Sequence, residues 1–227
     1  MLELCRAIIV APTPFDSRAL AEIATEVGFG DIASIFDDTD SSNGLRYPVS
    51  YFLVHHRLGD ADCTDIIDAV RHIDRPTLRY SPMVVLLPET SAESVRGFVR
   101  MGFDDVISLP QSQGELVARL GTQLDRDIVY FETADYLGPD RRRMDADGAL
   151  HRPAGISAHT RLVIRRDPDY GTRVLSRQLR GHQHPETAFG ETRPFTPIAL
   201  VAAAQTRTFG KRQQPPEAET ALPKAAR

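Results

Sequence analysis

Two short stretches carry the clearest structural signal in this 227-residue chain: PMVVLL at residues 82–87 and MGFDDVISLP at residues 101–110. The first is a continuous apolar run of the length of a β-strand. In the second, a glycine follows the end of a helical pattern, a short apolar strand comes next, and a proline turns the chain into a further helix. Strands that are apolar throughout are typical of a parallel sheet buried on both faces.

The same alternation of apolar runs with one-faced amphipathic segments extends over residues 1–126. We expect five strands, at Arg6–Val10, Asp31–Phe36, Tyr51–Val54, Met83–Leu87 and Val106–Leu109. We expect four helices, from Asp16 or Ser17 to Glu26 and over Thr64–His72, Ala92–Met101 and Gly114–Leu124. The polar residues 37–50, which contain Asn-Gly and a proline, predict that a helix between the second and third strands is short or missing. The fold class is therefore α/β, with a five-stranded parallel sheet covered on both faces.

The composition changes after residue 126. Nine of the sixteen prolines lie beyond Leu137, and long apolar runs become rare. Residues 127–210 are predicted to form a basic, irregular and partly disordered extension, in which Thr160–Arg166 and Thr172–Leu179 are able to pair as a β-hairpin. Residues 211–227, rich in Pro, Ala, Glu and Gln, are predicted to be a disordered tail.

Charge is divided along the chain in the same way. The net charge is −4, but the residues up to Leu137 hold 11 arginines and no lysine against 22 acidic residues, while the rest hold 16 basic against 9 acidic residues. Because the opposite charges lie on one polypeptide, docking of the basic part on the acidic part is the simplest expectation. Arg141, Arg142 and Arg143, the densest basic cluster, are expected to make such protein contacts, and binding to nucleic acid is the alternative.

Several classes of protein are not expected. No apolar run approaches the roughly 18–20 residues that a membrane span needs, and the N-terminus lacks the features of a signal peptide. Cys5 and Cys63 are far apart and have no metal-type spacing, so they are expected to be ordinary thiols in the cytoplasm. No glycine-rich phosphate loop, Ser/His/Asp arrangement or pair of general-acid carboxylates stands out, so neither an enzyme nor a cofactor is expected.

Residues 1–126 resemble the receiver domain of two-component response regulators. The resemblance rests on the fourth strand at residues 82–87 and on the corner at residues 101–110, whose proline is often cis in that family. The GPDRRR motif at residues 138–143 also resembles extensions that follow receivers in some bacterial regulators. The resemblance implies a flavodoxin-like fold. In an active receiver it also implies phosphoryl transfer to an aspartate, which requires Mg²⁺ and a lysine to offset negative charge.

The positions that carry this chemistry in a receiver hold other residues here. Ala11 and Pro12 stand where two acids would bind Mg²⁺, and His55 stands at the acceptor position. Leu87 stands at the position of the hydroxyl residue after strand four, and Leu109 stands at the position of the lysine. The first lysine of this chain is Lys211. The sequence therefore predicts a degenerate receiver, or pseudo-receiver, that is not phosphorylated on aspartate.

The predicted function is a non-catalytic receiver-like signalling module of a bacterial two-component or phosphorelay system. Its partner is expected to be a protein, either a signalling kinase or a regulator. By the resemblance, the contact face includes Arg96, Arg100 and Phe103 together with exposed residues of Gly114–Leu124. The first alternative is a DNA-associated regulator that uses the arginines at 141–143.

The second alternative is a histidine-based phosphotransfer or metal site at His55 and His56, with Asp37 and Asp38 nearby. A shared metal is not expected there, because adjacent residues of a strand point to opposite faces. The sequence carries no expectation about the oligomeric state.

Overall fold

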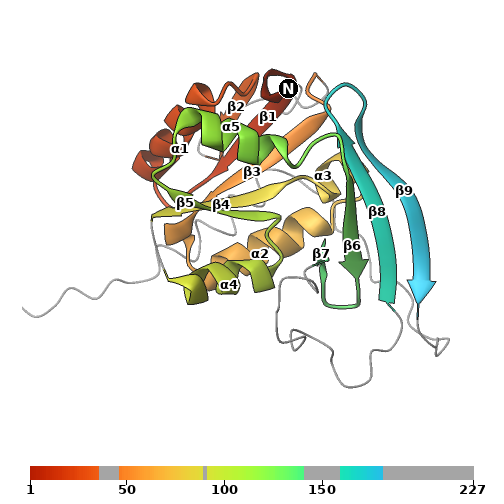
Figure 1. Cartoon of the computed structure of the whole chain (residues 1–227). Helices are drawn as coiled ribbons and strands as arrows, with labels where there is room; N and C mark the ends of the chain where they lie inside the picture. Colours follow the sequence, from red (N-terminus) through yellow and green to blue (C-terminus); the bar gives the residue numbers. More distant parts are fainter. Residues whose placement is uncertain (36–45, 89–90, 141–158, 181–227) are drawn as a thin grey trace, which may run out of the picture.

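Two β-sheets of different kinds organise the chain in the computed structural model, which describes residues 1–35, 46–88, 91–140 and 159–180 (Figure 1). The first sheet is parallel and has the strand order β2-β1-β3-β4-β5. Its strands are β1 (Cys5–Val10), β2 (Asp31–Ser34), β3 (Val49–His55), β4 (Met83–Pro88) and β5 (Asp105–Leu109). This is the strand order of the flavodoxin-like fold, so the predicted fold class is confirmed.

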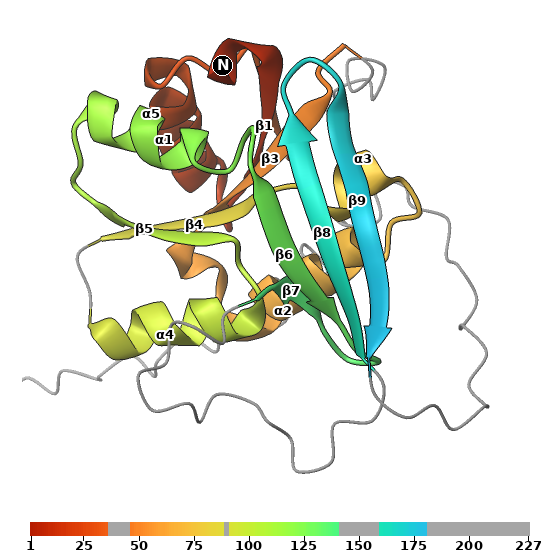
Figure 2. The same cartoon turned by 45° about the vertical axis from the view of Figure 1, so that its right-hand side comes forward.

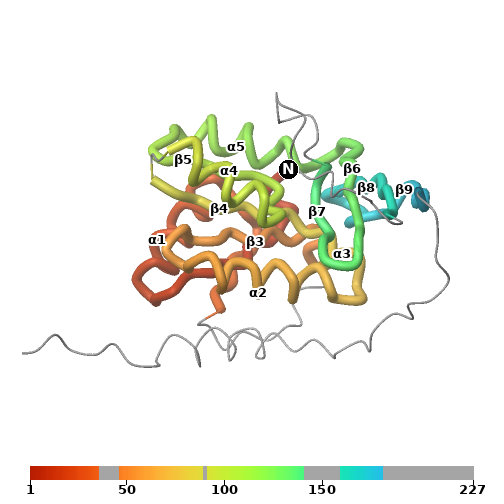
Figure 3. The backbone as a smooth tube through the Cα atoms, turned by 90° about the horizontal axis from the view of Figure 1, so that it is seen from below, coloured from red at the N-terminus to blue at the C-terminus, as the bar shows by residue number. Residues whose placement is uncertain are grey.

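Helices cover both faces of this sheet. Helices α1 (Pro14–Glu26) and α5 (Gln113–Gly121) pack on one face, and α2 (Asp60–Arg71) and α4 (Ala92–Met101) pack on the other (Figures 1 and 3). Each face has its own apolar cluster, because the strands bury side chains alternately on the two sides. Three shorter helical segments complete this part: η1 (Leu2–Leu4), η3 (His56–Leu58) and α3 (Pro76–Arg79).

The helix boundaries differ from the predicted ones for local reasons. Helix α1 begins at Pro14, because the Thr13 side chain, and not that of Asp16 or Ser17, accepts the hydrogen bond from a free backbone N–H of the first turn. Helix α2 begins at Asp60 instead of Thr64, directly after Gly59, whose φ is 82°. The four-residue α3 was not predicted, and the expectation of a short or missing second helix concerns residues of which 36–45 lie outside the described ranges.

The corner that the sequence emphasised has the form implied by the resemblance. Gly102 ends α4 in the left-handed conformation, with φ of 107°, and an added Cβ there would lie 3.4 Å from the Tyr136 ring. The Leu109–Pro110 peptide bond is cis. None of the helices in the described ranges combines the length and apolar character needed to cross a bilayer.

A second, antiparallel sheet follows the first. Its strands are β6 (Asp127–Glu132), β7 (Leu137–Pro139), β8 (His159–Asp167) and β9 (Gly171–Arg180), in the order β7-β6-β8-β9. Strands β8 and β9 form the hairpin expected from the sequence. The expectation of an irregular extension is wrong for residues 127–140 and 159–180, because β6 supplies Ile128 and Tyr130 to a small separate core. The predicted tail at 211–227 lies outside the described residues.

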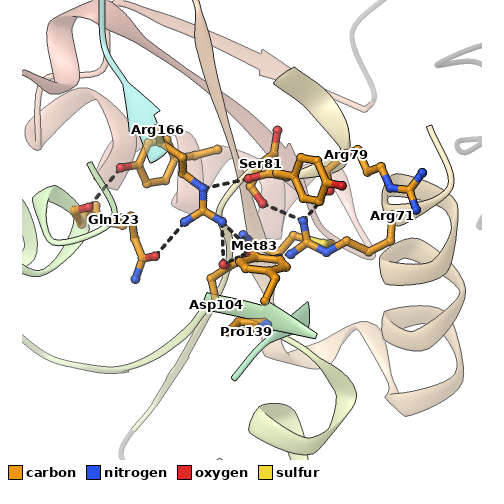
Figure 4. A network of polar contacts seen from close by, with 12 residues as sticks. Arg71, Arg79, Ser81, Met83, Asp104, Gln123, Pro139 and Arg166 are labelled. Atoms are coloured by element: carbon orange, nitrogen blue, oxygen red, sulfur yellow. Dashed lines mark hydrogen bonds and ion pairs between the residues drawn. The ribbon is translucent and has the colours of Figure 1, made fainter. Parts of the chain in front are cut away.

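The second sheet packs at the amino-terminal ends of the parallel strands through an arginine (Figures 2 and 4). Strand β8 buries every second side chain, and the last of these is Arg166, which is fully buried. Its guanidinium donates to Asp104 Oδ1 (2.6 Å), to the Tyr80 carbonyl oxygen (2.7 Å) and to Gln123 Oε1 (2.9 Å). Arg166 therefore bonds to partners just before β4 and β5 and to one just after α5.

Asp104 is the anion at the centre of this network. Its Oδ2 accepts from Arg71 Nη2 (2.7 Å) and from the Met83 backbone N–H (2.8 Å), and its Oδ1 also accepts from the hydroxyl of Tyr130. Burial raises the pKa of Asp104, but the nearby charges of Arg166 and Arg71 outweigh that effect and hold the pKa at about 2. The carboxylate is therefore ionised at neutral pH, and the boundary expected at residue 126 falls between two sheets that share one buried ionic network.

Replacing Arg166 by alanine is expected to destabilise the protein by about 3–5 kcal/mol, because a buried charge network loses one of its members. The matched control is Arg165→Ala, since Arg165 pairs with Asp127 on the exposed side of the same strand (2.5 Å) and such pairs contribute about 1 kcal/mol or less. Urea unfolding of the full chain measures both effects. Equal losses in the two variants would contradict the proposed importance of the network.

The stability difference between wild type and Arg166→Ala is expected to narrow as the pH falls from about 5 toward about 2. Asp104 has a folded-state pKa below that of an unfolded aspartate, so its contribution is complete above the unfolded value and is lost as the pH approaches the folded value. The variant retains only Arg71 as the cation beside Asp104 and has less of this contribution to lose. Urea midpoints across this range check the expectation, and a difference that widens toward acid would refute it.

Candidate functional site

The carboxyl ends of the parallel strands lie on the side of the first sheet that is away from the second sheet (Figure 1). Ligand sites of open α/β sheets lie at these strand ends. We call this end of the sheet the carboxyl edge. The structure places the five predicted positions here, directly after β1 and within the last two residues of β3, β4 and β5. Ala11 and Leu87 are buried, Pro12 is half-buried, and Leu109 packs partly against the core. These four side chains offer neither an oxygen to a metal ion nor a positive charge to a phosphoryl group.

One buried carboxylate at this edge was not among the predicted site residues. Asp16 lies in the first turn of α1, where its backbone N–H donates to Thr13 Oγ1 (3.1 Å) and the Thr13 hydroxyl donates to Asp16 Oδ2 (2.8 Å). These bonds fix the side chain so that Oδ1 lies 3.3 Å from Arg57 Nη1 and 3.8 Å from His55 Nε2. The helix turn thus brings a carboxylate back to the edge from a position beyond Ala11 and Pro12.

His55 occupies the end of β3, and its side chain is 14% exposed. Its Nδ1 accepts a hydrogen bond from the Arg57 backbone N–H (3.3 Å), so the neutral ring carries its proton on Nε2, the nitrogen that faces Asp16. Burial lowers the pKa of His55. The neighbouring His56 and Arg57 lower this pKa further, whereas Asp16 raises it. Neutral His55 is therefore favoured beside a carboxylate that already has Arg57 as its cation.

His55 and His56 do not point to opposite faces, so that expectation from the sequence is wrong. Strand β3 ends at His55, and residues 56–58 turn into a 3₁₀-helix, so the two rings lie side by side with centroids 4.5 Å apart and an interplanar angle of 31°. A metal site still finds no support in the described part of the chain, which contains no group of three or more His, Cys, Asp or Glu side chains placed to hold an ion. Asp37 and Asp38 lie outside the described residues.

A cleft of about 450 Å³ lies beside this edge, between η3, the end of β4 and α4. His56 and Asp60 line one side of it, and Leu87, Phe98 and Met101 supply apolar surface. The cleft is therefore separate from the buried Asp16 carboxylate, although η3 contributes to both places.

The residues of the predicted contact face differ in their exposure. Arg96 and Arg100 are exposed on α4, but Phe103 is fully buried and packs edge-on against Phe98, with ring centroids 5.8 Å apart. Phe103 is therefore wrongly assigned to an exposed face. The left-handed Gly102 turns the chain back under α4, which carries the next side chain into the core.

The basic cluster Arg141, Arg142 and Arg143 lies outside the described residues. Other arginines of the basic part bind acids of the same chain. Arg177 bonds to Glu132 (2.9 Å) and Arg166 bonds to Asp104, so two basic side chains of the second sheet pair with acids from the more acidic part. These contacts agree with the expectation drawn from the segregation of charge.

Two residues central to these arrangements were missed by sequence reasoning. Asp16 had a local signal, because Thr13 and Asp16 have the spacing of a capping box directly after a strand. Arg166 had a weaker one: it continues the alternation of buried positions in β8, although arginine is rarely buried at such a position.

No protein-family model matches the chain, and no curated protein matches its sequence. Solved structures that match include a response regulator from Thermotoga maritima, 16% identical over 52% of this chain and 94% of that chain, with a TM-score of 0.37. A response regulator receiver domain from Rhodospirillum rubrum is 19% identical over 51% and 90% of the two chains, with a TM-score of 0.35. A response regulator from Desulfuromonas acetoxidans is 17% identical over 52% and 94%, with a TM-score of 0.36. At this level of identity the likeness concerns the fold alone.

His55 is expected to titrate below the usual histidine pKa of about 6.5, and Asp16→Asn is expected to lower its pKa further. The reason is that Asp16 is the neighbour that favours the charged ring. Ring-proton NMR titration measures both values, with the His55 signal assigned through His55→Gln. Asp74→Asn, at an exposed position, is the control and leaves the pKa unchanged. A pKa that rises in Asp16→Asn would contradict this account of the site.

Proposed function

We propose that this chain is a receiver-like signalling module that acts by contact with a protein partner and does not accept a phosphoryl group on aspartate. The observation that carries the proposal is His55 at the end of β3, the position of the acceptor aspartate in a receiver. The flavodoxin-like strand order supports the comparison of positions, because it determines which residues meet at the carboxyl edge.

The charges at this edge also favour the proposal. An aspartate that attacks a phosphoryl group needs a divalent cation, held by further acids, and a lysine to offset the growing negative charge. Among the described residues at this edge, Asp16 is the one buried carboxylate, and its Oδ1 already faces Arg57 Nη1 at 3.3 Å. The chain has no lysine before Lys211. The described charges at this edge, those of Asp16 and Arg57, therefore compensate each other.

The cysteines are consistent with a non-catalytic module of the cytoplasm. Cys5 and Cys63 are free and buried, and burial raises the pKa of each thiol to about 12. Such thiols stay protonated at neutral pH and do not act as nucleophiles.

Without phosphoryl input, the contact face on α4, with Arg96 and Arg100, is constitutive or is switched by the partner itself. The partner would be a signalling kinase or regulator of a bacterial two-component or phosphorelay system. The DNA-associated alternative depends on Arg141–Arg143 and stays a prediction from the sequence.

Incubation of the full chain with acetyl phosphate and Mg²⁺ is expected to yield no phosphoryl adduct by intact-mass spectrometry. The matched variant is His55→Ala, which separates the remaining outcomes. An adduct sensitive to hydroxylamine and present in both proteins would be an acyl phosphate on a carboxylate and would contradict the proposal. An acid-labile adduct that is lost in His55→Ala would replace it with histidine phosphotransfer.

A further inference from the structure

Strand β9 is an edge strand with exposed side chains along most of its length. It stands last in the strand order, and among the described residues no strand pairs with its second edge (Figure 2). Three of its large apolar side chains are 41%, 47% and 52% exposed, those of Val174, Leu175 and Leu179. An edge of this kind, with exposed apolar side chains, is a template for pairing with another strand.

A β-bulge divides β9 into two parts. Val174 pairs with Ile164 and Ser176 pairs with Val163, so Leu175 has no partner on β8. The part before the bulge is covered at its start, because Gly171 and Thr172 are buried and an added Cβ at Gly171 would lie 3.2 Å from the Pro48 carbonyl oxygen. The open and regular part of the edge is therefore Ser176–Arg180.

The charge of β9 determines which strand can pair with it. Gly171–Arg180 contains Arg173, Arg177 and Arg180 and no acidic residue. A second copy of β9 in antiparallel pairing would bring these arginines close to one another, and like charges across a strand pair are destabilising. The bulge and the positive charges thus oppose self-pairing, which is how natural edge strands avoid association with their own copies.

The same arginines favour an acidic strand. Arg177 contacts Glu132 (2.9 Å) and Arg173 contacts Asp167 (3.2 Å), but both guanidiniums are more than half exposed, so these pairs are weak and both cations remain accessible to a second carboxylate. Arg180 donates to the neutral Gln178 Oε1 at 3.2 Å. Main-chain hydrogen bonds provide the affinity of strand addition, and alternate side chains provide its specificity.

We propose that the edge of β9 at Ser176–Arg180 docks an acidic extended segment of a partner protein, which adds to the second sheet as a further antiparallel strand. Arg177 and Leu179 share one face of the sheet, and Arg180 lies on the other. The segment therefore places carboxylates beside Arg177 and Arg180 on the two faces and an apolar side chain against Leu179. The proposal goes beyond the signalling role and does not depend on it, because β9 contributes nothing to the carboxyl edge of the first sheet or to the face on α4.

The test measures binding of two fluorescein-labelled peptides to the full chain by fluorescence anisotropy, one with the repeat Glu-Glu-Val-Val, which places Glu on both faces of a strand, and one with Lys in place of Glu. The acidic peptide is expected to bind about tenfold more tightly or better, with the difference shrinking at high salt. The variant Arg177→Glu/Arg180→Glu is expected to reverse the preference. The control Arg18→Glu/Arg126→Glu has the same net charge, with both changes at exposed positions outside the second sheet, and is expected to keep it.

Hydrogen exchange locates the bound peptide. The amides of Ser176–Arg180 that point away from β8 are expected to exchange more slowly once the acidic peptide is added, in wild type and in the control variant. Equal binding of both peptides, reversal in the control, or protection elsewhere would overturn the proposal. Amides of Ser176–Arg180 that point away from β8 and are already protected without peptide would also overturn it. Sedimentation would then show what protects these amides. A dimer would indicate that a second copy of the chain covers β9, and a monomer would indicate that another part of the same chain does.

A single variant, Arg180→Glu, guards against a folding defect in the double variant. Arg180 lies at the exposed end of β9. The circular dichroism spectrum of the Arg180→Glu variant is therefore expected to match that of wild type. A loss of preference for the acidic peptide in this variant would support the proposal. An unchanged preference in both charge-reversal variants would refute it.

Discussion

The ionised carboxylate of Asp104 is the constraint on which the arrangement of the two sheets depends. It lies just before β5 and accepts hydrogen bonds from Arg71 of α2, Arg166 of β8, Tyr130 of β6 and the backbone of Met83 in β4 (Figure 4). A buried carboxylate is tolerated only when its lone pairs are satisfied and its charge is compensated. The sheet at the amino ends therefore supplies two of the four donors to this carboxylate, those that bond to Oδ1.

The parallel sheet was predictable because its signal is local. Runs such as Met83–Leu87 are apolar throughout, and the corner at residues 101–110 contains its own helix stop and its own proline. The antiparallel sheet was only partly predictable. The β8–β9 hairpin has a turn between two alternating segments, but the burial of Arg166 depends on Asp104, 62 residues earlier, and no local pattern encodes that pairing.

The residues at the carboxyl edge were likewise predictable only in part from the sequence. The sequence was sufficient to place Ala11, Pro12, His55, Leu87 and Leu109 at strand ends, because each follows a recognisable apolar run. It was not sufficient for Asp16, which returns to the edge only because Thr13 orients the first turn of α1. Phe103 was misplaced because a face taken from a family says nothing of the direction of one side chain after a left-handed glycine. Adjacency on a strand likewise misled the interpretation of His55 and His56, since the strand ends between them.

The 62-residue separation of Arg166 from Asp104 also matters while the chain is being made. Domains fold during synthesis from the N-terminus, so the five parallel strands and their helices leave the ribosome before β8 exists. In that interval Asp104 has Arg71 as its cation but lacks Arg166, and the small apolar core of the second sheet has not formed. The nascent protein thus passes through a stage in which Oδ1 of its central carboxylate lacks the hydrogen bond that Arg166 donates. Translation of β8 ends that stage, because this strand carries the Arg166 guanidinium that completes the buried network.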